Sequence, residues 1–205
     1  MPTDFSKLPA FRARVIAGMN DGLTGAAIYL SGRMKASMQT KGKYLHSAPG
    51  TPPNVQRGLL RRSITSTPGR GLRASAGTNV KYGIYLEKGA IIRAKGKLLP
   101  VPVNPAAKRL RERTTGSLRS ANLRFIKTSK GNKLLIGNRR ERVSTVRNGQ
   151  RLNLSGVPVF ILKEVVVLKK RPWAVPAMRK NKAGIVRQFV TSARKSLTAR
   201  LGGAR

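Results

Sequence analysis

The chain has 205 residues, and its 43 Lys and Arg against 6 Asp and Glu give a formal charge of +37. Hydrophobic residues make up 40%, which suffices for a core and argues against a wholly disordered basic tail. Cysteine is absent, which excludes disulfides, thiolate nucleophiles and cysteine-based zinc or iron–sulfur sites. No apolar run approaches the ~18 residues that cross a bilayer. Residues 1–11 lack a secretory apolar segment, so we expect a cytoplasmic start and no membrane contact.

The first predicted element is a long helix over residues 9–40. Four glycines in this stretch either break the helix near residues 18–25 or allow another backbone to approach closely. A continuous helix is favoured, because an apolar stripe keeps its helical phase through the glycines. The stripe consists of Phe11, Val15, Met19, Leu23, Ala27, Leu30, Met34 and Met38. Residues 41–58, rich in Pro and Gly, are predicted to form a loop.

Two short elements follow this loop. Residues 59–79 are predicted to form a β-hairpin, because two alternating segments flank a Pro-Gly turn at residues 68–69. Residues 81–89 favour a helical turn over a strand, because three side chains share one face at i, i+3 and i+4. These side chains are Tyr82, Tyr85 and Leu86.

The rest of the chain alternates strands with connectors and ends in a helix. We expect a β-like segment in residues 90–103, interrupted at 95–97, and then a helix or polar excursion in 104–121. A hairpin is expected in 122–138 and a flexible or extended connector in 139–154. A strand is expected in 157–168. The last is the longest apolar run, which is typical of a central strand buried on both faces over part of its length. A second apolar stripe predicts a C-terminal helix that ends at Gly202, with Met178, Ile185, Phe189, Ala193, Leu197 and Leu201 on one face. Two long helices packed on a small antiparallel β-sheet make an α+β fold.

The acidic residues are too scattered to suggest a catalytic centre. A Mg²⁺ site needs several carboxylates, and a glycosidase needs a facing pair. The only histidine, His46, lies in a loop-like stretch, and one histidine makes neither a triad nor a metal cluster. The sequence therefore predicts a protein that is not an enzyme, with no catalytic or metal-binding residues and no cofactor. No two acids lie within six residues of each other: Asp4, Asp21, Glu87, Glu112, Glu141 and Glu164.

The net charge of +37 indicates a polyanionic setting. Such a charge repels itself in free monomers and attracts phosphate-rich partners. Two classes remain open: a nucleic-acid-binding protein of ribosomal or nucleoid type, and a structural protein that lies next to packed or moving nucleic acid. A third interpretation is that most of the charge is a solvated surface. Composition does not choose among them.

Short motifs occur in four segments and follow one another along the chain in a fixed order. The segments are residues 48–64, 81–90, 90–99 and 171–178. Together they resemble the tail-completion, or head–tail joining, proteins of long-tailed double-stranded-DNA bacteriophages. Residues 101–156 are longer than in compact members, so we expect one tail-completion-like domain over 1–205 with 101–156 as a basic insertion or extended arm. The matching residues are Gly58, Leu60, Ser63 and Ile64; Tyr82, Tyr85, Glu87 and Gly89; and Arg171, Pro172, Pro176 and Ala177, with Trp173 in an aromatic position.

The resemblance implies a structural virion protein of the head–tail connector, or neck, assembled in the cytoplasm of a bacterial host. It implies a homo-oligomeric ring, six- or twelve-fold, that joins the DNA-filled head to the tail tube and lines or surrounds the DNA exit channel. The expected partners are the portal-side connector, tail-tube or terminator proteins, and double-stranded DNA contacted through its phosphates. The alternative is a basic nucleic-acid-binding protein that contacts phosphates, which the charge favours equally and the motif order does not.

Five residues of these motifs are expected at a subunit interface. For Glu87, a buried or interfacial pair with Arg171 or Arg62 competes with an ordinary surface pair. Trp173 either anchors an interface or, as the only tryptophan, fills the seam between helix and sheet. The five residues are Tyr82, Tyr85, Glu87, Arg171 and Trp173.

Basic residues are dense in residues 93–147, which hold 16 Lys or Arg against two acids. The segment has one aromatic residue, Phe125, whereas readers of RNA or single strands stack bases on several. The pattern favours contacts with phosphates or with acidic protein surfaces over base recognition. The expected contact residues are Arg109, Arg111, Arg113, Arg139, Arg140 and Arg142.

Overall fold

The chain forms two compact units. The first, here called the helical unit, contains Met1–Ala90 and Lys169–Arg205, and the second, the sheet unit, contains Ile91–Leu168. Long helices together with antiparallel sheets confirm the predicted α+β class. The computed structural model describes residues 8–40, 47–95, 98–104, 107, 108, 110, 118, 121–138, 142–144, 151–153 and 155–202.

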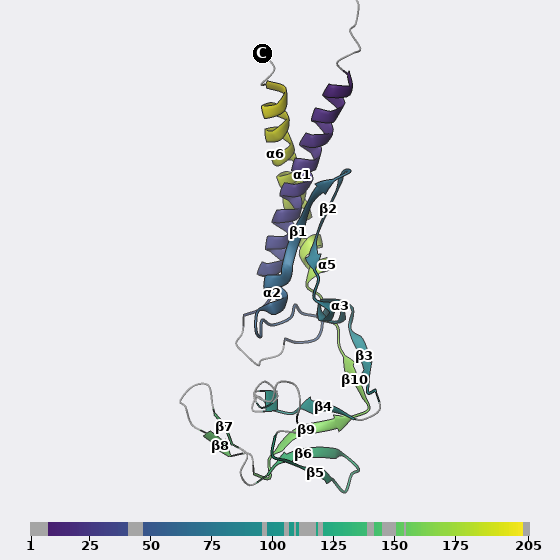
Figure 1. Ribbon diagram of the computed structural model, residues 1–205, viewed down its shortest axis with the longest axis vertical. Coiled ribbons are helices and arrows are strands. Elements are labelled where there is room, and N and C mark those ends of the chain that lie inside the picture. The colour runs from purple at the N-terminus through teal and green to yellow at the C-terminus, as the bar shows by residue number, and fades with distance from the viewer. Residues whose placement is uncertain are drawn as a thin grey trace, which may run out of the picture. The chain divides into compact units, whose positions relative to one another are not determined.

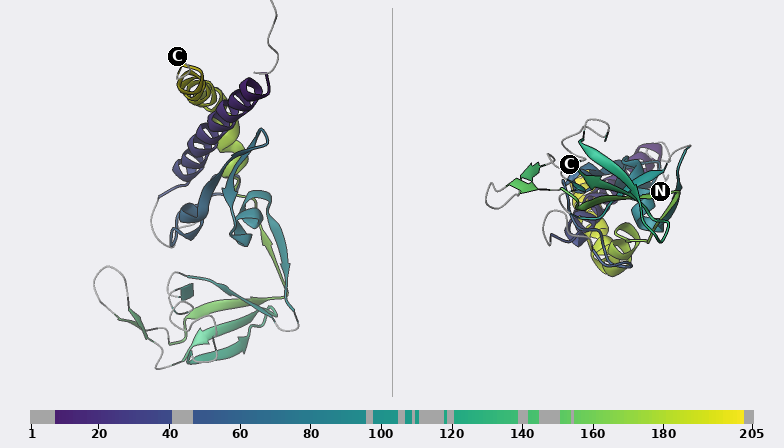
Figure 2. Two further views of the ribbon diagram at one scale, coloured as in Figure 1. Left: turned by 45° about the horizontal axis from the view of Figure 1, so that its top comes forward. Right: turned by 90° about the horizontal axis from the view of Figure 1, so that it is seen from below.

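Two long helices, α1 (Leu8–Ser37) and α6 (Lys182–Gly202), cross each other in the helical unit, as Figures 1 and 2 show. The prediction that α1 continues through its glycines is confirmed. A Cβ added to Gly22 would lie 2.7 Å from the Cβ of Ala193 on α6, and a Cβ on Gly18 would be as close to Leu197. The glycines therefore allow the two helices to approach more closely than larger residues would.

The predicted apolar stripe of α1 is buried only in its second part, at Ala27, Met34 and, just after the helix, Met38. In the first part, the buried residues are the small residues Gly18, Gly22 and, close to the centre, Ala26. Two bulky members of the stripe, Phe11 and Met19, are 53% and 36% exposed. Because α6 packs against the small residues, Phe11 and Met19 keep a large part of their surface exposed.

Gly22→Ala is expected to destabilise the helical unit, although alanine favours helices. The new Cβ forces α6 away from Ala193, and overpacking of this kind costs about 1–3 kcal/mol, against about 1 kcal/mol gained in helix propensity. The matched control is Gly32→Ala, because a Cβ there meets nothing within 4 Å; it is expected to stabilise by about 1 kcal/mol. Thermal unfolding followed by circular dichroism measures both. Stabilisation by both substitutions would contradict close helix contact at Gly22.

A β-hairpin of β1 (Ile64–Arg70) and β2 (Arg73–Thr78) packs along α1. The predicted turn at residues 68–69 is wrong. The chain reverses at Gly71 and Leu72, whose φ angles are 53° and 59°, as a two-residue hairpin loop requires. Residues 68–69 lie instead where the strand register shifts.

Polar contacts with α1 explain why the turn lies further along the chain. The hydroxyl of Thr24 accepts a hydrogen bond from the backbone N–H of Gly69 at 2.8 Å, and Asn20 Oδ1 accepts one from the N–H of Leu72 at 3.0 Å. A Cβ on Gly69 would collide with the backbone carbonyl of Asn20. Gly69 is therefore needed for contact with the helix and not for the turn.

Three short helices complete the helical unit: α2 (Leu59–Ser63), α3 (Lys81–Lys88) and α5 (Ala174–Lys180). Helix α3 confirms the helical turn predicted there. The strand predicted over the α2 residues is wrong, because the chain turns into a helix after Gly58, whose φ is 74°. The predicted C-terminal helix is divided at Asn181, whose side-chain amide donates to a carbonyl of α5. The core comprises Met34, Met38, Leu60, Ile64, Trp173 and Ala177.

The sheet unit is built on a four-stranded antiparallel sheet in the order β4-β9-β6-β5. The hairpin predicted in 122–138 is confirmed as the β5–β6 pair. Val159 and Phe160 of β9 are both 0% exposed, as expected for a central strand. The strands are β4 (Leu99–Pro102), β5 (Leu123–Lys127), β6 (Lys133–Gly137) and β9 (Pro158–Lys163).

The strand predicted over 157–168 is in fact two strands. It breaks at Glu164, whose carbonyl accepts a hydrogen bond from Ala94, and the second part, β10 (Val165–Leu168), pairs with β3 (Ala90–Arg93) in another sheet. Within the predicted connector, β7 (Arg142–Ser144) and β8 (Arg151–Asn153) pair as antiparallel strands. The pairing is local, between consecutive strands, and the sequence pattern did not indicate it.

Candidate functional site

Glu87, in the last turn of α3, caps the N-terminus of α5. Its Oε2 accepts hydrogen bonds from the backbone N–H groups of Trp173 at 2.6 Å and Ala174 at 2.9 Å, and its Oε1 accepts one from Val175 at 3.0 Å. The first N–H groups of a helix have no intrahelical acceptor, and a carboxylate suits the positive end of the helix dipole. A single side chain thus joins two of the motif segments.

The pair with Arg171 or Arg62, which the sequence left open for Glu87 beside an ordinary surface pair, is not the arrangement that forms. Both carboxylate oxygens of Glu87 bind backbone amides. Arg171 Nε donates to the backbone carbonyl of Ser47 at 3.1 Å, and Arg62 donates to the carbonyl of Arg57 at 3.2 Å. Backbone groups compete successfully because capping and loop closure leave them without other acceptors or donors.

Trp173 lies in the core of the helical unit. Its side chain is 4% exposed, and its indole Nε1–H donates to the carbonyl of Gly83 at 3.2 Å. A Cβ on Gly83 would lie close to Trp173, Leu60 and Thr78, so the absence of a side chain at Gly83 leaves space for the indole ring. Of the two positions considered from the sequence, the structure places Trp173 in the core.

The two tyrosines of α3 remain on the surface. Tyr82 is 39% exposed and Tyr85 is 48% exposed, and Ile84 between them is 58% exposed. Partial burial raises the pKa of the Tyr82 phenol, and a hydrogen bond with the backbone of Leu60 acts in the opposite direction. These side chains are accessible for an interface, and their role there stays a prediction.

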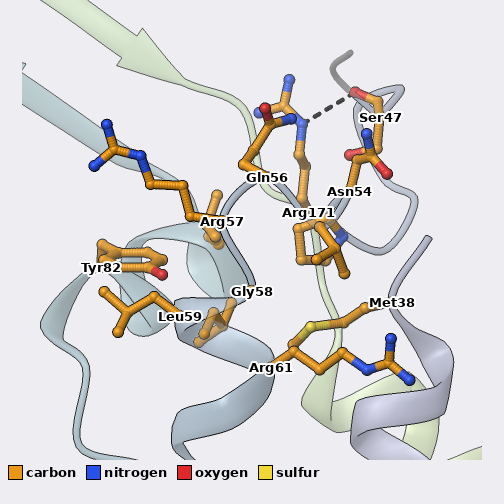
Figure 3. A pocket seen from close by; sticks show the side chains of 14 residues that line it. Met38, Ser47, Asn54, Gln56, Arg57, Gly58, Leu59, Arg61, Tyr82 and Arg171 are labelled. Carbon is orange, nitrogen blue, oxygen red and sulfur yellow. Dashed lines mark hydrogen bonds between the residues drawn. The ribbon is translucent and has the colours of Figure 1, made fainter. Parts of the chain in front are cut away.

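The motif segments enclose a cavity of about 400 Å³ within the helical unit, shown in Figure 3. Backbone hydrogen bonds join the segments around it: Arg171 N–H donates to the carbonyl of Leu86 at 2.6 Å, and Gly50 N–H donates to the carbonyl of Lys170 at 2.9 Å. The lining residues are Met38, Ser47, Pro53, Asn54, Val55, Gln56, Arg57, Gly58, Leu59, Leu60, Arg61, Tyr82, Leu86 and Arg171.

The cavity combines apolar side chains with positive charge. Its lining includes Met38, just after α1, and apolar residues from α2, α3 and the 47–58 loop, together with three arginines. None of the described residues that line it is acidic. Ser47 is 5% exposed, and within the described part of the chain its hydroxyl has no hydrogen-bond partner. Such a cavity can accept an apolar group that carries negative charge beside it.

Sequence reasoning found part of this cavity. It identified Tyr82 and Arg171, and it marked the 48–64 segment as a motif. Ser47 and Leu86 were not proposed as site residues, because the local pattern gives no signal at Ser47 and places Leu86 only on one face of a helical turn. They become cavity residues only when the 47–58 loop, α3 and the segment before α5 come together.

The predicted basic contact residues cannot be assigned to a surface. Arg109, Arg111, Arg113, Arg139 and Arg140 lie outside the described residues, and Arg142 is described only through its backbone in β7. Their role in binding phosphates or acidic partners stays a prediction.

In the described part of the chain, no three His, Asp or Glu side chains come close enough to hold a metal ion. No helix in that same part is both long and apolar enough to span a bilayer. The chain matches none of the protein-family models, curated proteins or solved structures with which it was compared.

Proposed function

We propose that the chain is a structural subunit of the neck of a long-tailed double-stranded-DNA bacteriophage, where it forms a homo-oligomeric ring between the head and the tail tube. The observation that carries the proposal is the meeting of three motif segments in space. Glu87 of the 81–90 motif caps the helix of the 171–178 motif, and the 48–64 motif lines a cavity with both. A shared interaction of these segments is a reason for their residues to occur together, which supports the proposal.

Exposed apolar side chains on the two long helices support a role within an assembly. Monomeric proteins rarely leave large apolar areas in water, and subunits bury such surfaces against their neighbours. A ring would cover these positions, and the free chain would associate with itself. On α1 they are Leu8, Phe11, Met19 and Ile28, and on α6 they are Val186, Val190 and Leu201.

The proposal is tested on particles made from the genome that encodes the chain. Antibodies against the chain, seen by negative-stain microscopy, are expected to label the junction between head and tail. Deletion of its gene is expected to leave DNA-filled heads and separate tails in the lysate. Labelling of ribosomes or of the nucleoid, with normal particles in the deletion, would contradict the proposal.

The alternative is a nucleic-acid-binding protein, which the charge of +37 favours. Contacts through phosphates alone would be independent of sequence and would weaken with salt by about 0.9 log units per contacted phosphate per log unit of salt. The triple variant Arg139→Gln, Arg140→Gln, Arg142→Gln separates the two roles. If these arginines bind acidic neighbours in the neck, the variant joins few heads to tails and keeps its DNA affinity; normal joining with lost DNA binding would favour the alternative.

A further inference from the structure

We propose that the cavity lined by α2, α3 and the 47–58 loop is a docking site for an acidic segment of another protein, with an apolar side chain of that segment inside the cavity. The inference deepens the proposed function. It rests on that function only for the position of the partner, which would be a neighbouring protein in the neck of the particle. The binding site itself is argued from the helical unit alone.

The lining of the cavity defines the apolar part of the partner. Its volume of about 400 Å³ lies in the range of pockets that enclose a ligand group, roughly 300–1,000 Å³. Met38, Val55 and Leu86 contribute apolar surface, and Leu59 at the mouth is 54% exposed. One or two apolar side chains of a peptide would remove this surface from water.

The arginines define the charged part of the partner. Arg61 and Arg171 line the cavity (Figure 3). Guanidinium groups bind carboxylates through paired hydrogen bonds, which fixes orientation as well as charge. Since no described lining residue is acidic, a bound segment with carboxylates would complement the charge of Arg61 and Arg171.

The buried hydroxyl of Ser47 indicates that the cavity is a built site. A buried polar group without a partner carries a free-energy cost of about 1–3 kcal/mol. Within the described residues the Ser47 hydroxyl has no partner, and the residue is 5% exposed and lines the cavity. A backbone or side-chain group of a docked segment would satisfy it.

A second copy of this chain is a poor source of the segment. Its acids are isolated in sequence, so no stretch offers two carboxylates to two arginines. The described acids are also engaged: Glu87 caps α5, Glu164 lies 3.9 Å from Lys133, and Asp21 accepts from Ser196 and Arg200. The hydrogen bonds from Ser196 and Arg200 hold the pKa of Asp21 below its usual value.

Nucleic acid also fits the cavity poorly. Proteins that hold single strands stack successive bases on aromatic side chains along a basic groove, and this cavity has one aromatic lining residue, Tyr82, among those described. Phosphate contacts need basic groups along a surface and do not need apolar walls. The apolar lining therefore favours a peptide.

The test measures fluorescence polarisation with the full-length protein and two labelled hexapeptides at about 0.15 M salt, where charges beyond about 8 Å are screened. The first peptide is Asp-Asp-Leu-Phe-Asp-Asp, and in the second two serines replace the apolar pair. The first is expected to bind at least about tenfold more tightly, which corresponds to about 1.4 kcal/mol. Equal binding of the two peptides would overturn the proposal.

Two pairs of variants locate the binding. Leu59→Ser and Arg61→Glu change the cavity, and Leu72→Ser and Arg73→Glu make the same chemical changes on the β1–β2 hairpin outside it. All four side chains are exposed, so the fold should persist, and circular dichroism checks this. The cavity variants are expected to weaken binding of the first peptide about tenfold, and the hairpin variants by less than about twofold. Equal losses in both pairs would overturn the proposal.

Competition identifies the occupant. If a 20-base-pair DNA duplex displaces the first peptide and the cavity variants also lose DNA affinity, nucleic acid is the occupant and the proposal is wrong. If Arg61→Glu abolishes self-association in light scattering, a second copy is the occupant and the proposal is equally wrong. If the peptide test fails but antibodies label the junction between head and tail, only this inference is rejected. If the peptide binds specifically but antibodies do not label the particles, the docking site is retained and the proposed function in the neck is rejected.

Discussion

Replacing Trp173 with alanine is expected to lower the free energy of unfolding of the helical unit by about 3–5 kcal/mol, the usual cost of truncating a buried large aromatic residue. The ring is 4% exposed and packs with Leu60, Ile64 and Ala177. Its loss leaves a void among residues from four elements and removes the hydrogen bond to the carbonyl of Gly83. Since a domain is stable by only about 5–15 kcal/mol, the variant is expected to be marginally folded.

Urea unfolding followed by circular dichroism measures this loss. Tryptophan fluorescence cannot report on the Trp173→Ala variant, because Trp173 is the only tryptophan. Tyr85→Ala is the control: it also removes an aromatic ring, but Tyr85 is 48% exposed, so a change within about 0.5 kcal/mol is expected. Trp173→Phe should fall between the two, since it keeps a ring and loses the Nε1 hydrogen bond. Equal stability of the Trp173→Ala and Tyr85→Ala proteins would contradict the core position.

Replacing Glu87 with alanine is expected to cost about 1.5–3 kcal/mol, the worth of hydrogen bonds to a charged group, at or above the usual range for the loss of a helix cap. Three backbone N–H groups at the start of α5 lose their acceptor. The link between α3 and the segment that carries Trp173 is lost at the same time. Glu87→Gln is expected to lose less, because one amide oxygen still accepts.

Trp173 provides the measurement for the Glu87 variants. Its fluorescence in a urea titration reports on the helical unit, because the ring lies beside the cap. Glu164→Ala removes the same charge, but Glu164 is in the sheet unit with a side chain 78% exposed. For Glu164→Ala, the midpoint of the urea transition followed by tryptophan fluorescence is not expected to shift. A similar shift for Glu87→Ala and Glu164→Ala would mean that net charge, and not the cap, is responsible.

The sequence by itself determined the elements that depend on local pattern. Helix α1, the turn of α3 and the β5–β6 hairpin were all predicted, because periodicity and turn residues act over a few positions. The α+β class followed from their order. Within the site, Tyr82 and Arg171 were identified from the sequence, whereas the convergence of the motif segments was not predicted.

The tertiary structure decided which face, partner or register each element uses. Small residues of α1 are buried in place of Phe11 because α6 approaches at the glycines. The hairpin turns at Gly71 because Gly69 is held against α1. The apolar run 157–168 divides between two sheets because each half finds a different non-local strand. Glu87 binds amides in place of arginine because α3 lies at the start of α5. Each outcome depends on groups distant in sequence, and a local pattern does not specify such contacts.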